Sequence, residues 1–182
     1  MKKLMIATFA LAAIAISPKV NAQTKMVGGA AMYPTKNIIQ NAVNSKDHTT
    51  LVAAVKAAGL VETLESAGPF TVFAPTNEAF DKLPAGTVDN LLKPENKATL
   101  VKILTYHVVA GRMSAHDLWN KVKAGNGKAE LKTVEGGTLT VMAQGRKLYL
   151  VDEKGGKSWI TIADVNQSNG VIHVVNTVLM PD

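Results

Sequence analysis

Near its middle the sequence reads Gly68-Pro69-Phe70-Thr71-Val72-Phe73-Ala74-Pro75-Thr76-Asn77-Glu78-Ala79-Phe80. Residues 70–74 are β-prone and apolar on both faces, which predicts a short buried strand that ends at Pro75. Thr76 is placed to cap a following helix, and the helix dipole favours Glu78 in its first turn. The stretch therefore predicts a strand inside the core that leads directly into a helix.

Working outward from this stretch, the first half of the chain is mainly helical. Apolar residues have helical spacing within 38–43, 51–58, 88–92 and 94–104. Gly59 stands where a left-handed helix end is expected. The segment Thr105 to Val109 predicts a strand, and the spacing of Ser114 and Asp117 matches a capping box at the start of another helix. Regular structure is expected to begin near Asn37.

The second half changes to β-rich runs. They span residues 131–134, 138–143, 147–151, 158–163 and 170–179, with Gly-containing turns between them. Strands in succession predict an antiparallel meander. Helices followed by a meander indicate an α+β fold rather than a parallel doubly wound fold. No internal repeat divides the chain, so we expect one domain over residues 37–182, preceded by a flexible lead-in at 23–36.

The first 22 residues have the pattern of a secretory signal peptide. Two lysines follow Met1, an uncharged apolar run spans Leu4 to Ile16, and Ala22 offers a small residue for cleavage. The alternative is a short membrane anchor, but the run of 13 residues is shorter than the roughly 20 that a spanning helix needs. We expect cleavage after Ala22, no membrane span in the mature chain, and export to the periplasm or the exterior.

Composition narrows the possible partners. The chain has 20 basic and 14 acidic residues, and three of the lysines lie in the leader, so the mature net charge falls from +6 to +3. The lysines are scattered and only two arginines are present, which argues against a nucleic-acid partner. There is no cysteine, so the fold must be stabilised by its core without disulfides.

Three segments together resemble the fasciclin domain family. The stretch 68–80 is similar to the first signature box, Asn169 to Pro181 is similar to the second, and Leu104 to Val109 is similar to the Tyr-His segment between them. The resemblance covers Asn37 to Pro181. It implies a wedge of two β-sheets with helices packed around it, display outside the cell, and adhesion, matrix or biofilm contact without enzymatic activity or a cofactor. The implied partner is a protein or polysaccharide at the cell exterior.

Binding residues follow from the same resemblance. In animal relatives the Tyr-His segment has been linked to integrin binding, which makes Tyr106 and His107 the candidates here. The other interpretation is that both side chains are buried and hydrogen-bonded, as polar groups in a core normally are. His173 alternates with apolar residues and favours the buried interpretation. The second box departs from the family at Asn176, where an acidic residue is usual, so integrin contact through that box is not expected.

Motifs of catalysis and metal binding are missing from the sequence. No Gly-x-Ser-x-Gly, His-Glu-x-x-His or phosphate-binding loop is present. His107 and His173 alone make a poor metal site, because zinc takes three or four protein ligands. We therefore expect no catalytic residue and no metal.

Two functional hypotheses stay open. The first is an adhesion or interaction module outside the cell. The second is a carrier of an apolar small molecule such as a carotenoid or lipid, because some algal members of the family carry carotenoids. Methionine and aromatic side chains adapt to apolar ligands, and the residues that would line such a groove are Met113, Trp119, Met142, Tyr149 and Trp159.

Overall fold

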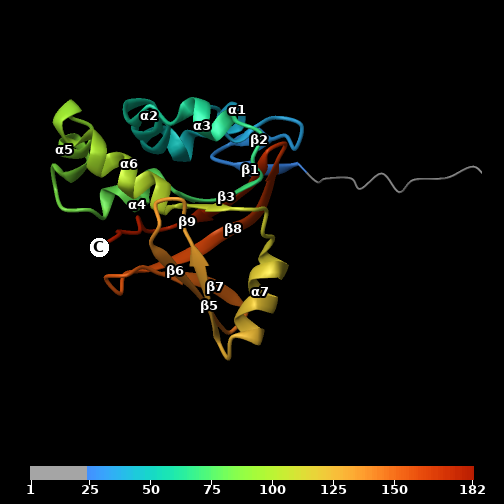
Figure 1. Ribbon diagram of the computed structural model, residues 1–182. Coiled ribbons are helices and arrows are strands. Elements are labelled where there is room, and N and C mark those ends of the chain that lie inside the picture. The colour runs from blue at the N-terminus through green and yellow to red at the C-terminus, as the bar shows by residue number, and fades with distance from the viewer. Residues whose placement is uncertain (1–23) are drawn as a thin grey trace, which may run out of the picture.

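The computed structural model describes residues 24–182, so the predicted leader at 1–22 lies outside the described residues. Strand β3 (Phe70–Pro75) comes from the first signature box and is largely buried. β3 lies parallel to β9 (Gly170–Val175), which comes from the second box, with Phe73 opposite His173. The two segments that carry the resemblance are therefore neighbours in one sheet (Figure 1).

Seven strands form this sheet in the order β4-β3-β9-β8-β7-β6-β5. Every pair except β3–β9 is antiparallel. The remaining strands are β4 (Val108–Ala110), β5 (Lys128–Lys132), β6 (Thr138–Gln144), β7 (Lys147–Val151) and β8 (Lys157–Gln167).

Strand β8 joins two halves of the sheet. Its first three residues pair with β7, and the part from Ile160 onward pairs with β9. The register shifts between Ile160 and Ile162 and again before Val165. Such irregularities bend a strand and increase its local twist. The β5–β7 half therefore turns away from the β4–β3–β9 half, which gives the expected two-sheet wedge as one continuous sheet folded at β8 (Figure 1).

Helices cover the two halves unequally. Among residues 24–182, six helices lie over the β3–β9 half and a seventh lies against the β5–β7 half (Figure 1). The covering helices are α1 (Ile38–Ala42), α2 (Thr49–Ala58), α3 (Val61–Glu65), α4 (Asn77–Asp81), α5 (Thr87–Leu91) and α6 (Lys97–Tyr106), with 3₁₀ turns η1 (Lys46–His48) and η2 (Pro94–Asn96). The seventh is α7 (Ala115–Ala124). Within residues 24–182, no helix combines the length and apolarity needed to cross a membrane.

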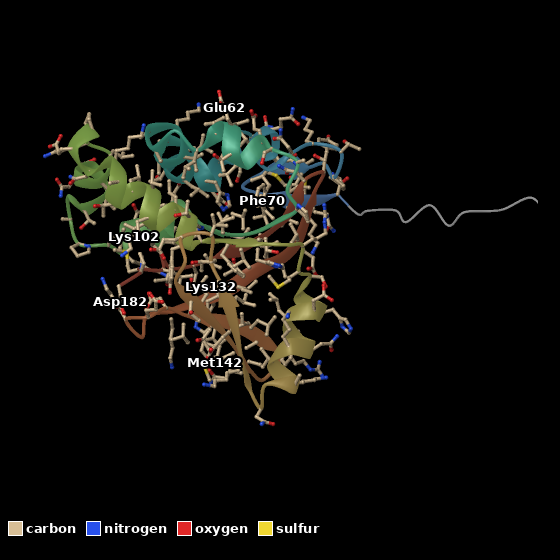
Figure 2. The ribbon with its side chains drawn as sticks, in the orientation of Figure 1. Glu62, Phe70, Lys102, Lys132, Met142 and Asp182 are labelled. Carbon is tan, nitrogen blue, oxygen red and sulfur yellow. The ribbon has the colours of Figure 1, made fainter. Side chains whose placement is uncertain are left out.

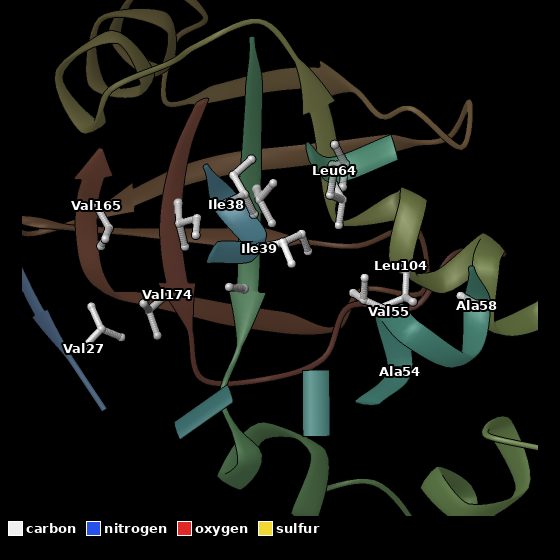
Figure 3. Packing of buried hydrophobic residues seen from close by; sticks show 14 of the residues in the cluster. Val27, Ile38, Ile39, Ala54, Val55, Ala58, Leu64, Leu104, Val165 and Val174 are labelled. Carbon is white, nitrogen blue, oxygen red and sulfur yellow. The ribbon is translucent and has the colours of Figure 1, made fainter. Parts of the chain in front are cut away.

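Each half of the sheet has its own apolar core. Between the helices and β3, β9 and β8, a buried cluster extends from Val55 and Leu104 to Val174 and Val165 (Figure 3). A second core fills the space between α7 and the β5–β7 half, where Leu118, Leu139 and Leu150 are fully buried. Fully burying one such side chain stabilises the fold by about 1.5–3 kcal/mol. The domain thus has two packed layers on either side of the bend at β8.

The helix caps expected from the sequence are confirmed. Thr76 accepts a hydrogen bond from the Ala79 N–H at the start of α4. Ser114 and Asp117 form a reciprocal capping box at the start of α7. The α+β class and the wedge are also as expected. The parallel pairing of β3 with β9 was not predicted, because sequence periodicity does not show which strands become neighbours.

Two local expectations are wrong. Residues 24–36 are not an irregular lead-in: β1 (Lys25–Val27) and β2 (Ala30–Met32) form a hairpin. Gly28 and Gly29 both have positive φ, as the two-residue turn of such a hairpin requires, and Val27 and Met32 are buried in the first core. The boundary at Asn37 as a domain limit stays a prediction. In addition, Thr105 and Tyr106 belong to α6 rather than to a strand.

Candidate functional site

The Tyr-His segment lies at the junction of α6 and β4. Tyr106 is the last residue of α6 and His107 is its C-cap. Tyr106 is 0% exposed and His107 3% exposed. Neither side chain is available to a partner at the surface of the folded domain, so the structure places both sequence candidates in the core.

His107 is held by two hydrogen bonds to the backbone. Its Nδ1 lies 2.8 Å from the carbonyl oxygen of Ile103, and its Nε2 accepts from the N–H of Leu179 at 3.0 Å. Nδ1 must therefore carry the proton, and the ring is neutral. Burial lowers the pKa of His107 to about 4, against smaller raising effects of the Ile103 carbonyl and Asp152. This histidine joins helix α6 to the second signature box.

Tyr106 reaches into the other half of the sheet. Its hydroxyl donates to the carbonyl of Thr138 at 2.7 Å and accepts from the N–H of Glu153 at 3.2 Å. Burial raises its pKa to about 12, and the Glu153 N–H opposes this shift. The adjacent residues Tyr106 and His107 thus connect the helical layer with β6 and with the chain end, across the bend of the wedge.

His173 is fixed in the same manner, with the opposite tautomer. Its Nδ1 accepts from the Asp164 N–H at 3.3 Å, its Nε2 donates to the Met113 carbonyl at 2.8 Å, and its ring stacks on Phe73 with centroids 5.7 Å apart. Burial lowers its pKa. Both nitrogens of His107 and of His173 are thus occupied. Among residues 24–182, no group of three or more His, Cys, Asp or Glu side chains is arranged to hold a metal ion.

Asn176, the departure from the family pattern, has a structural role here. Its Oδ1 accepts from the N–H of Trp159 at 2.9 Å and from the hydroxyl of Thr177 at 3.3 Å. Its backbone N–H donates to the Trp159 carbonyl, and its own carbonyl accepts from Lys82. The side-chain oxygen thus continues the β8–β9 pairing beyond the end of β9.

An open groove lies where the two halves of the sheet separate. β7 pairs with β8 only at Tyr149, Leu150 and Val151, so the strands diverge on the other side of Tyr149. The groove between them has a volume of about 730 Å³. Its lining comes from the start of α7, the β6–β7 turn, β8 and the residue after β9: Ala115, Trp119, Arg146, Lys147, Leu148, Trp159, Ile160, Thr161, Ala163 and Asn176.

The five groove residues expected for an apolar carrier are only partly brought together. Trp119 and Trp159 line the groove. Tyr149 packs on Trp159 with ring centroids 4.9 Å apart, and its hydroxyl lies 3.5 Å from the sulfur of Met142. Met113 instead packs against the second core. Figure 2 shows Met142 on the β5–β7 half, at the opposite end of the molecule from Glu62 on α3.

Sequence reasoning did not single out the two cations of this groove. Arg146 and Lys147 follow Gly145, whose positive φ makes the tight β6–β7 turn. Both are exposed. The turn signal was visible in the sequence, and it places both residues at a hairpin tip. That tip becomes one wall of a groove because β7 and β8 diverge. This divergence belongs to the tertiary structure and gives no local signal in the sequence.

A second hollow is almost entirely apolar. It lies between helices α1–α3 and the sheet, has a volume of about 70 Å³, and includes Val55, Leu64 and Val174 in its lining (Figure 3). His48 also borders it. His48 Nδ1 bonds the Ser45 hydroxyl at 2.8 Å, whereas Nε2 has no hydrogen-bond partner among the described residues. Burial lowers the pKa of His48, partly offset by the nearby Ala74 carbonyl and by Asp47.

Comparison with known proteins gives a consistent result. The family model described as Fasciclin domain matches residues 46–181. Protein sll1483 of Synechocystis sp. is 47% identical over 159 residues, covering 87% of this chain and 81% of that protein. Immunogenic protein MPB70 of Mycobacterium bovis is 35% identical over 194 residues, covering 96% of this chain and 92% of that protein.

A solved structure shows the same fold. It is described as a FAS1 domain pair from the insect cell adhesion molecule Fasciclin I, and it matches with a TM-score of 0.70 and 18% sequence identity. The match covers 80% of this chain and 51% of that chain, so this chain spans about half its length. At this identity the likeness concerns the fold alone.

Proposed function

The chain belongs to the fasciclin domain family, and on this premise we propose that it is a non-enzymatic adhesion or interaction module that acts outside the cytoplasm. Its expected setting is a cell surface, an extracellular matrix or a biofilm. Membership of the fasciclin domain family, whose members mostly act in adhesion, matrix or biofilm contact, supports the adhesive role. The leader pattern at residues 1–22 supports export to the periplasm or the exterior.

One observation carries this proposal. The side chains best suited to chemistry, Tyr106, His107 and His173, are buried, and their polar atoms bond to the backbone. A catalytic group must reach the reacting atoms within hydrogen-bond distance. These residues instead hold the layers of the fold together. What the domain offers to other molecules is its exposed surface, which suits binding.

Tyr106 and His107 have an indirect role in this proposal. They fix the junction between α6, β4 and the C-terminal segment, and through it the surface that a partner meets. Replacing either would lower binding in proportion to the loss of folded protein. A surface contact, by contrast, would lower binding without lowering stability.

The experiment is an attachment assay in the native host. Deleting the gene should reduce surface attachment or biofilm, and the full-length gene should restore it. A copy without residues 1–22 should fold but fail to restore attachment, because it stays in the cytoplasm. Unchanged attachment of the deletion strain on several surfaces would contradict the proposal.

A second candidate function is the carrying of a small apolar molecule, favoured by the apolar hollow with His48 at its border. A hollow of about 70 Å³ is several times the roughly 10–15 Å³ that a single water needs, so it accommodates a small molecule. A carotenoid or lipid chain would need helices α1–α3 to move. Protein purified from the native host would be examined by visible spectrum and lipid extraction, and a colourless, ligand-free preparation would contradict this function.

A further inference from the structure

We propose that the groove between β7 and β8 binds an acidic polysaccharide, with Arg146 and Lys147 holding the carboxylate or sulfate groups and Trp119 and Trp159 packing against the sugar rings. This inference rests on the proposed role outside the cytoplasm and names the partner class for it. Four features of the groove carry it: its charge, its aromatic side chains, its free hydrogen-bonding groups and its open shape.

The charge of the groove is positive. Its lining contains Arg146 and Lys147 and no acidic residue. Neither cation forms a salt bridge within residues 24–182. Two carboxylates beside Ala115 and Trp119 serve the start of α7: Asp164 accepts from the Ala115 N–H at 2.7 Å, and Asp117 completes the capping box. The two cations are therefore free for an anion, and a guanidinium is suited to bidentate carboxylate binding.

The aromatic side chains lie on both sides of the gap. Trp119 projects from α7 and Trp159 from β8, and both are half-buried. Tyr149 supports Trp159 from the neighbouring strand, with ring centroids 4.9 Å apart. The face of an aromatic ring carries negative potential, which attracts the weakly positive C–H groups on the face of a sugar ring. Two indoles in one groove, one of them supported by Tyr149, favour stacking with a chain of sugars.

Hydrogen-bonding groups complete the site. The Oδ1 of Asn176 is engaged with Trp159 and Thr177, which leaves its Nδ2 to donate into the groove. Thr161 is exposed on the same wall, and its hydroxyl donates to the Val174 carbonyl at 3.2 Å. That hydroxyl oxygen can still accept. One donor and one acceptor beside the indoles match the hydroxyl groups of a sugar.

The shape of the groove favours a polysaccharide over a peptide. The groove is open at the surface, so a polymer can pass along it. A peptide would bind here by adding a strand to the exposed edge of β8. However, β8 is irregular between Ile160 and Ile162 and again before Val165, and bulges disrupt the regular ladder that an added strand needs.

The chain offers its own reporter for a test. It has two tryptophans, and both line this groove, so tryptophan fluorescence reports on the site directly. The protein would be titrated with a galacturonate hexasaccharide, and in parallel with neutral cellohexaose and a hexaglutamate peptide. We expect the acidic sugar to change the emission, the neutral sugar to bind at least several-fold more weakly, and the peptide to leave the emission unchanged.

Two double variants make the test specific. R146Q/K147Q removes both cations from exposed positions and should weaken galacturonate binding about tenfold, as the loss of two exposed ion pairs implies. K93Q/K97Q removes the same charge from the helical layer and should leave binding unchanged. Raising the salt concentration from 50 to 500 mM should weaken binding of the unaltered protein and have less effect on R146Q/K147Q.

Several results would overturn the inference. They are no emission change with galacturonate up to 10 mM, equal binding of the neutral sugar, equal binding of the glutamate peptide, or equal weakening by both double variants.

The attachment assay separates this inference from the proposed function. If R146Q/K147Q restores attachment to the deletion strain in full, the groove is not the binding site although the adhesive role stands. If galacturonate binds but deletion leaves attachment unchanged, the groove stands and the adhesive role fails.

Discussion

The Nε2 atom of His107 accepts a hydrogen bond from the backbone N–H of Leu179 at 3.0 Å. This contact joins the Tyr-His segment to the second signature box, 72 residues later in the chain. Protonation of the ring would place a proton on Nε2, directly against the N–H of Leu179. The bond therefore requires a neutral imidazole, and it links the stability of the domain to pH.

Acidification should destabilise the domain before its carboxylates titrate. The pKa of His107 is about 4 in the folded chain against 6.5 when unperturbed, so between these values the unfolded chain binds a proton that the folded chain does not. The free energy of unfolding should fall as pH drops from about 6.5 to 4, by up to about 3 kcal/mol from this residue. His48 and His173, whose pKa values are also lowered, act in the same direction.

Urea denaturation at pH 7.5, 6.5, 5.5 and 4.5 measures this dependence. The H107Q variant should show a shallower pH dependence than the unaltered protein, although it is less stable at every pH. Asp117 and Glu153 have lowered pKa values, so their contribution is lost only at still lower pH. A midpoint that stays constant from pH 7.5 to 4.5 would refute the role assigned to the neutral histidines.

Tyr106→Phe should destabilise the domain although it removes one oxygen atom only. The hydroxyl serves the Thr138 carbonyl and the Glu153 N–H, and losing it leaves both without this partner at a cost of about 1–3 kcal/mol. Tyr33→Phe is the matched control, since the Tyr33 side chain is 47% exposed, and it should change stability by less than about 0.5 kcal/mol. Thermal and urea unfolding compare the two, and equal stabilities would contradict the prediction.

Asn169→Asp should be among the more harmful nearly isosteric changes. Asn169 Oδ1 accepts from the Ile38 N–H at 3.0 Å, while Nδ2 donates to the carbonyls of Leu64 and Ser66 at 2.7 and 2.8 Å. An aspartate keeps the acceptor but turns an oxygen toward two carbonyl oxygens, at a cost of about 3 kcal/mol. The neighbouring, exposed Ser168→Asp serves as a control. Similar urea midpoints for the two variants would show that the amide is not needed.

Ser114→Ala should loosen the start of α7. The Ser114 hydroxyl accepts from the Asp117 N–H at 3.1 Å, and loss of such a cap costs about 0.5–2 kcal/mol. Because α7 carries Trp119, the emission of the folded variant should also shift to longer wavelength as that indole becomes more hydrated. Ser168→Ala, at an exposed position without a cap, should alter neither stability nor emission. The prediction fails if Ser114→Ala matches that control.

Local signals in the sequence were accurate where the structure depends on neighbours along the chain. The caps at Thr76 and Ser114 follow from a polar side chain three residues before a free N–H. The β-rich runs of the second half lie close to β5–β9, because alternation and turn residues act over a few positions. The pair Gly28-Gly29 was misinterpreted as flexible, since the same glycines suit a loop and a tight hairpin turn.

The residues of the candidate site were predicted from the sequence less accurately than the fold. Tyr106 and His107 were identified as binding candidates from the family resemblance, yet their burial and their partners Ile103, Thr138 and Leu179 depend on how α6 packs against the sheet. The sequence around Arg146 and Lys147 predicted a turn and gave no local sign of a binding site. Their importance arises because β7 and β8 diverge after Tyr149, which is a relationship between strands.

The sequence by itself determined the membership of the fasciclin domain family, the α+β class, and most element positions, because these depend on local patterning and on distinctive segments. Only the tertiary structure decided that β3 and β9 are parallel neighbours, that His48, His107 and His173 are buried, and that two tryptophans and two cations line one groove. The physical reason is that burial and long-range hydrogen bonds join residues up to 138 positions apart. Such contacts arise from the packing of all the layers together.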